Sequence, residues 1–393
     1  MTPTHEEARQ HVLAAARRLA PEFEARAAES EELRTLPKDL ADAAVREGLC
    51  KMWLPRQLGG FELDPLTAIE VGETVTRADG SAGWTVLIGN GTAFFGWLEP
   101  TLAESLVGTS GEWTTTSVFA PSGMAEPAGD RTYRLSGRWA FNSGCPHSEW
   151  QIVGAFISDG CGPRMRADGQ PDLRFVYLPM ASGVIEDTWD ALGLRGTGSH
   201  HVSISDAVVS EDCMPAPLFE PARFDGPLWR LPLLTQCAIL MAGFPLGVGR
   251  RVLDEFTELA KTKFRGAPTE TLLGDSNTHL VLARAEAALL SARSFVFDVV
   301  DHVWETCLRG DVPSAEERAQ VHLATNQAMK AAVEGLDTVY RLSGASAVQH
   351  GQVMERCFRD LHTANQHIIF SDGLSKTYAR LRLGLEPGGP LPI

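Results

Sequence analysis

The chain has 393 residues, which is too long for one small hydrophobic core and predicts two or three packed units. Hydrophobic residues make up 44% and charged residues 22%, the balance of a soluble globular protein. The formal net charge of -15, without any basic block, argues against nucleic acid and against an anionic membrane as partners.

The first part of the chain, residues 1–111, reads as a helical domain. Thr4 and Glu7 have the spacing of a capping box, which predicts a helix that starts there. The stretch from Pro65 to Trp97 is apolar and predicts one further helix.

The middle part, residues 112–232, reads as a β-domain. Short β-branched or aromatic runs such as "YRLSGRWAFNSG", "WQIVGAFIS" and "HHVSISDAVV" are separated by Gly, Pro, Ser or Asp. This punctuation predicts an antiparallel, barrel-like unit.

The last part, residues 233–393, predicts a helical bundle. An apolar stripe at three- and four-residue steps predicts the seam of this bundle: Leu280, Ala283, Ala287 and Leu290. Ser314 and Glu317 form a second capping-box pattern, and Gly344 is placed to end that helix. The uncharged stretch 231–249 is nearly long enough to span a membrane, but its prolines and glycines favour the entry of a buried helix.

Several classes of site are excluded by spacing. His362 and His367 are five residues apart, so on a helix they diverge by about 140° and do not share a face. His200 and His201 are adjacent and alternate if they lie on a strand. We therefore expect no metal site.

The seven cysteines contain no CxxC pair, and the polar N-terminus has no signal-peptide core, which predicts a cytoplasmic protein with reduced thiols.

Motifs for nucleotides and for acyl transfer are also missing. Two GxG strings, "GNGTAFFG" and "GVGRRV", lack the third glycine of a dinucleotide fingerprint and its strand–helix context. No P-loop and no GxSxG elbow is present.

Five strings in a fixed order carry a resemblance to a known family. They are "LPKDLADAAVREGLCKMWLPRQLGG", "ADGSAGW", "GRWAFNSGCPHSEW", "DTWDALGLRGTGSHHV" and "ERCFRDLHTANQH". Together they resemble the acyl-CoA dehydrogenase fold and, within it, the two-component flavin-dependent monooxygenases. The resemblance implies an α+β, mainly α fold: an N-terminal helical domain, a central antiparallel β-domain and a C-terminal four-helix bundle.

One position separates the oxygenating branch from the dehydrogenases. Many dehydrogenases carry a glutamate base after the Arg-Asp pair, because removal of the α-proton of a thioester requires a carboxylate within reach. Ile368 stands at that position here, and His367 precedes it, as in the oxygenating relatives.

The resemblance implies a reaction with oxygen. Reduced flavin (FADH2 or FMNH2), supplied by a separate NAD(P)H-dependent flavin reductase, would react with O2 to form a C4a-hydroperoxyflavin. That species would hydroxylate a small, electron-rich, mostly apolar aromatic substrate such as an indole or a phenol. The absence of a nicotinamide fingerprint fits this scheme, because the partner enzyme would bind NAD(P)H.

The resemblance also implies roles for individual residues. His367 would hydrogen-bond the flavin hydroperoxide or take a proton from the substrate, and Ser143 would act near the reactive edge of the flavin ring. Further contacts to the flavin ring, its phosphate or its ribityl chain are expected from Trp113, Thr114, Ser117, Val118, Phe141, Ser143, Lys263, Arg265, Ser343 and Gly344. For each residue a purely structural role is the alternative, such as a turn serine, a core aromatic or a solvated helix end. His362 is expected to be a bystander.

One departure narrows the chemistry. Several oxygenating relatives carry a further histidine after the "ADGSAGW" segment, where this chain has Asn90 and Thr92, and His147 is the possible substitute. This favours a substrate that needs no deprotonation.

The resemblance also implies a homotetramer. Two other functions stay open: an acyl-CoA or acyl-carrier dehydrogenase with a relocated base, and a catalytically silent scaffold.

Overall fold

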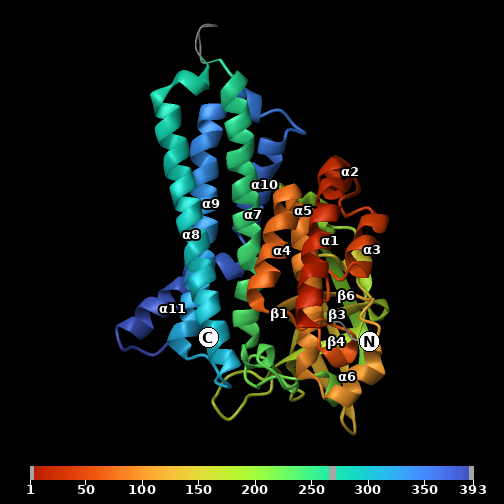
Figure 1. Ribbon diagram of the computed structural model, residues 1–393. Coiled ribbons are helices and arrows are strands. Elements are labelled where there is room, and N and C mark those ends of the chain that lie inside the picture. Colours follow the sequence, from red (N-terminus) through yellow and green to blue (C-terminus); the bar gives the residue numbers. More distant parts are fainter. Residues whose placement is uncertain (1–3, 265–270, 389–393) are drawn as a thin grey trace.

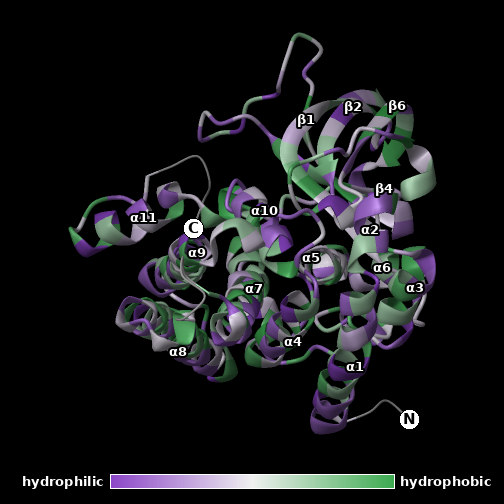
Figure 2. Cartoon of the chain, turned by 90° about the horizontal axis from the view of Figure 1, so that it is seen from above, coloured by the Kyte–Doolittle hydropathy of each residue, from purple (hydrophilic) through white to green (hydrophobic). Residues whose placement is uncertain are grey.

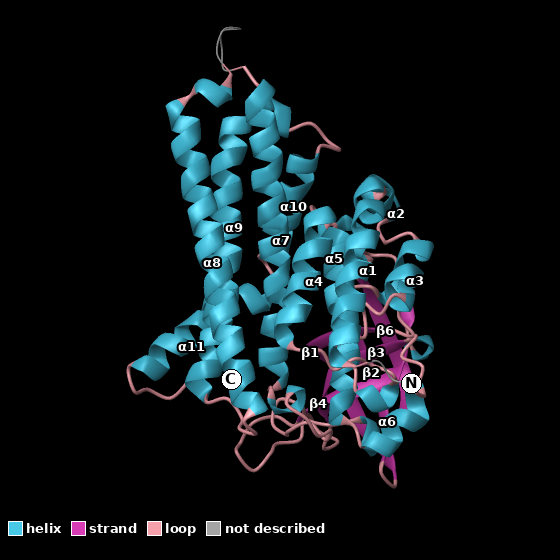
Figure 3. Cartoon of the chain, viewed as in Figure 1, coloured by secondary structure: helices cyan, strands magenta, loops and turns pink. Residues whose placement is uncertain are grey.

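The computed structural model describes residues 4–264 and 271–388. Figure 1 shows a layer of helices and a sheet from the first half of the chain beside a tall bundle of long helices from the second half. Figure 3 shows the strands gathered in one part of the molecule, with helices elsewhere. The expected order of helices, β-unit and bundle is confirmed.

The N-terminal part is helical, as predicted. Its helices and 3-10 segments are α1 His5–Ala25, α2 Ala27–Leu33, α3 Lys38–Arg46, η1 Arg56–Leu58, α4 Pro65–Ala78, α5 Gly80–Gly89, η2 Asn90–Trp97 and α6 Pro100–Val107. The predicted capping box starts α1, because the Thr4 side chain accepts from the Glu7 N–H and Glu7 accepts from the Thr4 N–H.

The prediction of one helix from Pro65 to Trp97 is wrong. Asp79 adopts an extended conformation (φ -153°, ψ 129°), which interrupts the helix, and its carboxylate accepts from the Ala82 N–H at 2.8 Å. An aspartate competes with helix continuation by capping the next helix in this way. The segment is therefore two helices followed by a 3-10 stretch, and α5 can leave α4 at an angle.

The middle part forms one six-stranded sheet in the order β4-β3-β1-β2-β6-β5. The strands are β1 Thr115–Gly129, β2 Thr132–Asn142, β3 Trp150–Ile157, β4 Leu173–Pro179, β5 Val184–Glu186 and β6 His200–Ser210. The pairing is antiparallel as predicted, except that β1 and β3 pair in parallel. Since β4 and β5 stand at the edges of this order, the described strands do not close into a barrel.

The bundle consists of α7 Leu233–Thr262, α8 Ser276–Leu308, α9 Ala315–Ser343 and α10 Val353–Ala364, followed by η10 Ile368–Phe370 and α11 Asp372–Arg382. Both predicted end signals are confirmed: Ser314 and Glu317 form the capping box of α9, and Gly344 follows its last residue with φ 54°. Glycine tolerates this left-handed backbone.

Helix α7 is the central helix of the fold. Figure 2, seen from above, shows it between α9 on one side and α4 on the other. By length and composition α7 is apolar enough to cross a membrane, but 83% of its most apolar window is buried inside the protein. The expectation of a buried helix in stretch 231–249 is therefore confirmed for the part that lies in α7.

The predicted bundle seam lies on the wrong face of α8. Its four residues are exposed, with Leu280 at 48% and Leu290 at 56%. The buried face is a second apolar stripe that includes Ala285, Leu289, Ala292 and Val296. Periodicity identifies apolar stripes on a helix, but it does not say which of two stripes faces the same chain.

Candidate active site

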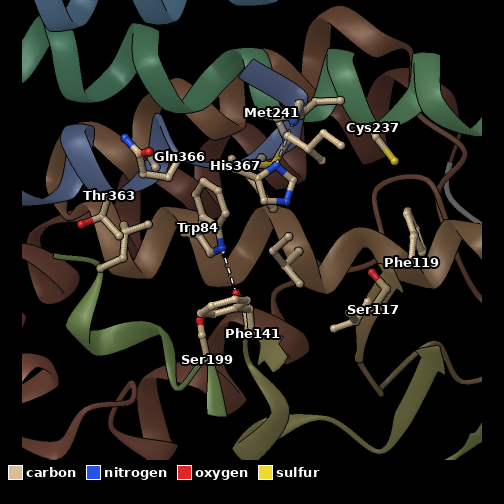
Figure 4. A pocket seen from close by; sticks show the side chains of 18 of the residues that line it. Trp84, Ser117, Phe119, Phe141, Ser199, Cys237, Met241, Thr363, Gln366 and His367 are labelled. Carbon is tan, nitrogen blue, oxygen red and sulfur yellow. Dashed lines mark hydrogen bonds between the residues drawn. The ribbon is translucent and has the colours of Figure 1, made fainter. Parts of the chain in front are cut away.

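A large cavity lies where the sheet meets the helices, with a volume of about 1020 Å³. Its wall comes from β1, β2, α5, α7, the loop before η5 (Arg195–Thr197) and the end of α10. Figure 4 shows Trp84 beside His367 in this wall, with Ser117 and Phe119 toward one side and Thr363 toward the other. Among the described residues, no Lys, Arg, Asp or Glu lines the cavity.

His367 presents a hydrogen-bond donor to the cavity. The residue follows α10 and caps η10, where its Nδ1 accepts from the Ile369 N–H at 3.3 Å. Because Nδ1 is the acceptor, the ring proton of the neutral imidazole is on Nε2. The ring lies edge-on to Trp84, with 5.5 Å between centroids. Burial lowers the pKa of His367 to about 4, so the ring is neutral near pH 7.

Ser143 belongs to a chain of hydrogen bonds that starts at Trp84. Trp84 Nε1 donates to Ser143 Oγ at 3.0 Å, and Ser143 Oγ lies 2.7 Å from Ser199 Oγ. Ser199 Oγ lies 2.6 Å from Thr197 Oγ1, which donates to the Leu194 carbonyl at 2.8 Å. Each hydroxyl has only one proton to donate. All three contacts are hydrogen bonds only if Ser143 donates to Ser199, Ser199 donates to Thr197, and Thr197 donates to the Leu194 carbonyl. Ser143 is then left with an acceptor lone pair.

Phe141 is held in an unusual conformation at the cavity wall. Its φ is 66°, and the β2–β6 register shifts between Trp139 and Asn142. A bulge re-aims a side chain, and positive φ is costly for a bulky residue unless the surroundings enforce it. The ring is 66% exposed and lies edge-on to Trp189. The fold therefore presents an aromatic side chain at the cavity wall that its contacts with Trp189 and His201 leave largely exposed.

A buried set of charged residues, here called the ion cluster, anchors α10. Its members are Glu31, Asp79, Glu355, Arg356, Arg359 and Asp360. Arg359 Nη1 donates to Glu31 at 2.6 Å, and Arg359 also pairs with Glu355. Asp360 accepts from the Leu194 N–H at 2.6 Å, which ties α10 to the turn that carries Thr197 and Ser199. Burial, reinforced by Asp79, raises the pKa of Asp360 to about 8.

The structure brings together part of the predicted site. His367, Ser143, Ser117, Val118 and Phe141 all line the cavity. Trp113 and Thr114 lie outside its wall: the Trp113 ring packs on Phe95, with 4.8 Å between centroids, and Thr114 Oγ1 donates to the Gly89 carbonyl at 3.3 Å.

The predicted phosphate and ribityl residues form a separate group outside the cavity wall. Lys263 Nζ donates to Ser346 Oγ at 2.6 Å, next to Gly344 at the end of α9. Ser343 is buried and donates to the Val339 carbonyl at 2.9 Å. Arg265 lies outside the described residues.

The other polar candidates have structural partners. The Asn90 amide donates to the carbonyls of Leu49 and Val86 and does not line the cavity. Thr92 donates to the Cys50 carbonyl. His147 contacts Thr35 Oγ1 at 2.9 Å outside the cavity wall, so it does not replace the missing histidine.

His362 lines the cavity, but its Nε2 lies 2.9 Å from Asp337 Oδ1. Its assignment as a bystander remains a prediction. The described residues contain no group of three or more His, Cys, Asp and Glu side chains suited to a metal ion.

Sequence reasoning missed two features of the site. Trp84 stood within a recognised string, but no local signal indicated that its indole N–H would fix Ser143. The ion cluster was also missed, although acids and bases alternate through α10, whose apolar residues share one face. That pattern was the available signal.

Comparison with known proteins places the chain in a family. The N-terminal domain of acyl-CoA dehydrogenases matches residues 2–116, and the C-terminal domain matches residues 239–372, together more than half of the chain. An indole-3-acetate monooxygenase of Pseudomonas putida is 29% identical over 92% of this chain and 91% of its own length. The oxygenase subunit HsaA of a flavin-dependent monooxygenase from Rhodococcus jostii is 27% identical over 89% of this chain and 92% of its own.

A solved structure agrees with this placement at the level of the fold. XiaF from Streptomyces sp., in complex with FADH2 and glycerol, has a TM-score of 0.89 at 24% identity and covers 98% of both chains. The chain thus belongs to the acyl-CoA dehydrogenase family, as a flavin-dependent monooxygenase of that fold.

Proposed function

We propose that the protein is the oxygenase component of a two-component system, which uses reduced flavin and O2 to hydroxylate an electron-rich, mostly apolar aromatic. The observation that carries this proposal is that His367 and Ser143 line one apolar cavity, on either side of Trp84, with Ile368 in the wall where a dehydrogenase is expected to carry its glutamate. Relatives named as oxygenase subunits support a separate NAD(P)H-dependent reductase as the partner.

The cavity fits a flavin ring together with a substrate. Its volume of about 1020 Å³ is at the upper end of ligand pockets, which run from roughly 300 to 1,000 Å³. The exposed face of Phe141 offers a surface against which a flat ring can stack. The complex of XiaF with FADH2 supports the same cofactor here. When bound, reduced flavin supplies the two electrons with which one atom of O2 enters the substrate and the other leaves as water.

The residues of this chain orient the reactants and exclude water. His367 donates from Nε2, so its role is to stabilise an oxygen atom that gains negative charge during the transfer. A second proton would have to add at Nδ1, which is opposed because Nδ1 accepts from the Ile369 N–H and burial disfavours the charged ring. Of the two roles expected for His367, the geometry supports the donor. Ser143 would accept a hydrogen bond from an N–H group of the cofactor. The apolar wall would keep water out, so that less of the oxygen is released as hydrogen peroxide.

A dehydrogenase with a relocated base is disfavoured by the wall of the cavity. That reaction requires a carboxylate within hydrogen-bond reach of the substrate. Within residues 4–264 and 271–388, the wall contains no Asp or Glu.

The test is oxygen-dependent turnover. Reduced flavin from an unrelated reductase and NADH is supplied to the purified protein with ¹⁸O2 and a panel of indoles, phenols and thioesters. We expect a product that carries one ¹⁸O atom from an aromatic member, detected by mass spectrometry. Reduction of an electron acceptor with a thioester, without any labelled aromatic product, contradicts the proposal. A silent scaffold predicts that flavin does not bind in a titration.

The outward stripe of α8 supports assembly. Leu280, Ala283, Ala287 and Leu290 are exposed, and an apolar stripe of this kind on a soluble protein marks a contact surface. We propose that it packs against another copy, in the homotetramer that the resemblance implies, and that the enzyme works in the cytoplasm. Light scattering of Leu290→Glu beside Leu290→Gln tests the contact, since both substitutions remove the apolar group and only one adds charge.

A further inference from the structure

The described wall of the cavity contains no Asp, Glu, Lys or Arg. The side chains in it that titrate are His362, His367 and Cys237. Burial raises the pKa of the Cys237 thiol to about 12 and lowers that of the His367 imidazole to about 4. Both are therefore uncharged near pH 7. The polar groups that remain are hydroxyls, an amide and imidazoles, which bind neutral donors and acceptors.

Three described arginines that contact or neighbour lining residues pair with carboxylates of this chain. Arg359 pairs with Glu31 and Glu355 and donates to the Leu192 carbonyl at 3.1 Å. Arg195 pairs with Asp190 at 2.7 Å. Arg138, on the strand that carries Phe141, donates to Glu186 at 2.7 Å.

A carboxylate contacts one of the lining side chains, and its sign is unfavourable for an anion. Asp337 lies 2.9 Å from His362 Nε2. A ligand carboxylate in this cavity would thus lose its water without gaining a cation, which disfavours its binding. An uncharged amide of the same shape would lose less and would find hydroxyl partners in the wall, such as Ser117.

We propose that the cavity is selective for uncharged aromatic molecules and rejects those that bear a carboxylate. The inference rests on the proposed function and narrows its substrate class. It also separates this chain from its relative in Pseudomonas putida, whose name gives a carboxylate, indole-3-acetate, as the substrate.

Isosteric pairs that differ only in charge provide the test. Indole-3-acetamide is compared with indole-3-acetate, phenylacetamide with phenylacetate, and 4-hydroxybenzamide with 4-hydroxybenzoate. Equilibrium dialysis against the flavin-loaded protein at pH 7.5 gives the dissociation constants, and turnover with reduced flavin gives kcat/KM. For at least one pair we expect the amide to bind about 100-fold more tightly than the acid. Equal binding, tighter binding of any acid, or binding of no amide overturns the proposal.

A charge placed at the rim sharpens the test. Leu192 lines the cavity and is 65% exposed, so a long polar side chain is tolerated there. Leu192→Arg should reduce the preference for the amide over the acid about tenfold relative to the matched control Leu192→Gln. A ratio that is the same in both variants contradicts a charge-based selectivity.

The two readouts separate this inference from the proposed function. If dialysis discriminates amide from acid but no substrate gives an oxygenated product, the proposed function fails and the charge selectivity stands. If aromatic products form equally from amides and acids, the function stands and the selectivity fails.

Discussion

The ion cluster and the cavity share helix α10, yet they bury polar groups in opposite ways. Four residues of this helix belong to the cluster, Glu355, Arg356, Arg359 and Asp360, and Arg359 pairs with two carboxylates. One turn later, Thr363, Gln366 and His367 face the cavity without a single fixed charge. Because the cluster satisfies its own charges, it can position the end of α10 without placing an electric charge beside the reacting atoms. The site then works through oriented neutral donors.

The largest effect is expected from breaking the cluster. Arg359→Met leaves Glu31 and Glu355 buried without their partner, and removal of one member of a buried pair costs about 3–5 kcal/mol. We expect this loss in the free energy of unfolding, measured by urea denaturation. The matched control is Arg195→Met, which breaks the pair with the exposed Asp190 and should cost about 0–1 kcal/mol. Equal losses in the two variants would mean that the cluster does not anchor the fold.

The next largest effect is expected at His367, which follows α10 and lines the cavity. His367→Asn keeps an acceptor for the Ile369 N–H but removes the donor at Nε2, whereas His367→Gln places an amide N–H near that position. We expect about 100-fold less oxygenated product per flavin oxidised for the Asn variant and partial recovery for the Gln variant. Product yield against hydrogen peroxide is the measurement. Retained flavin binding in both variants is the control, and an Asn variant with full yield would exclude the donor role.

The same contrast explains what the sequence could predict. Capping at Thr4 and Ser314 depends on partners three residues away, so the local pattern was sufficient. The placement of His367 and Ser143 followed from the resemblance, although their roles remain proposals. Arg359 and Glu31 are 328 positions apart, and no local pattern indicates such a pair. The exposed stripe of α8 was assigned to the core because burial depends on neighbours that periodicity does not specify.

The pH dependence of stability reports on Asp360, whose carboxyl group has a raised pKa in the folded protein. Burial and the neighbouring Asp79 raise the pKa of Asp360 to about 8 in the folded protein, against 3.8 for an unperturbed aspartate, so the folded protein holds a proton that the unfolded chain releases. Its contribution is complete below the lower value and is lost as pH rises through the higher one. Between pH 6.5 and 8, we expect the free energy of unfolding to fall by about 2 kcal/mol.

Asp360→Asn should flatten that slope, because an amide still accepts from the Leu194 N–H but does not titrate. The buried histidines His322 and His367, whose pKa is lowered to about 4, act only below pH 6.5 and leave this window unaffected. Asp190→Asn, at an exposed site, is the control. Urea titrations at four pH values give the slopes, and identical slopes for wild type and Asp360→Asn would contradict a protonated Asp360.

The smallest effect is expected in the cavity wall, at the hydrogen bond between Ser143 and Ser199. Ser199→Ala removes the acceptor for the Ser143 proton, so that the Ser143 hydroxyl is free to turn and to donate into the cavity. A net loss of about 1 kcal/mol in stability is expected for one such hydrogen bond, together with about tenfold more hydrogen peroxide per product, because Ser143 no longer presents only an acceptor. Ser203→Ala, which removes a hydroxyl of β6 that donates to Glu186 on the paired strand β5, is the matched control and should leave coupling unchanged. If Ser199→Ala loses stability but keeps its coupling, the chain of hydroxyls supports the fold and does not orient Ser143 for the reaction.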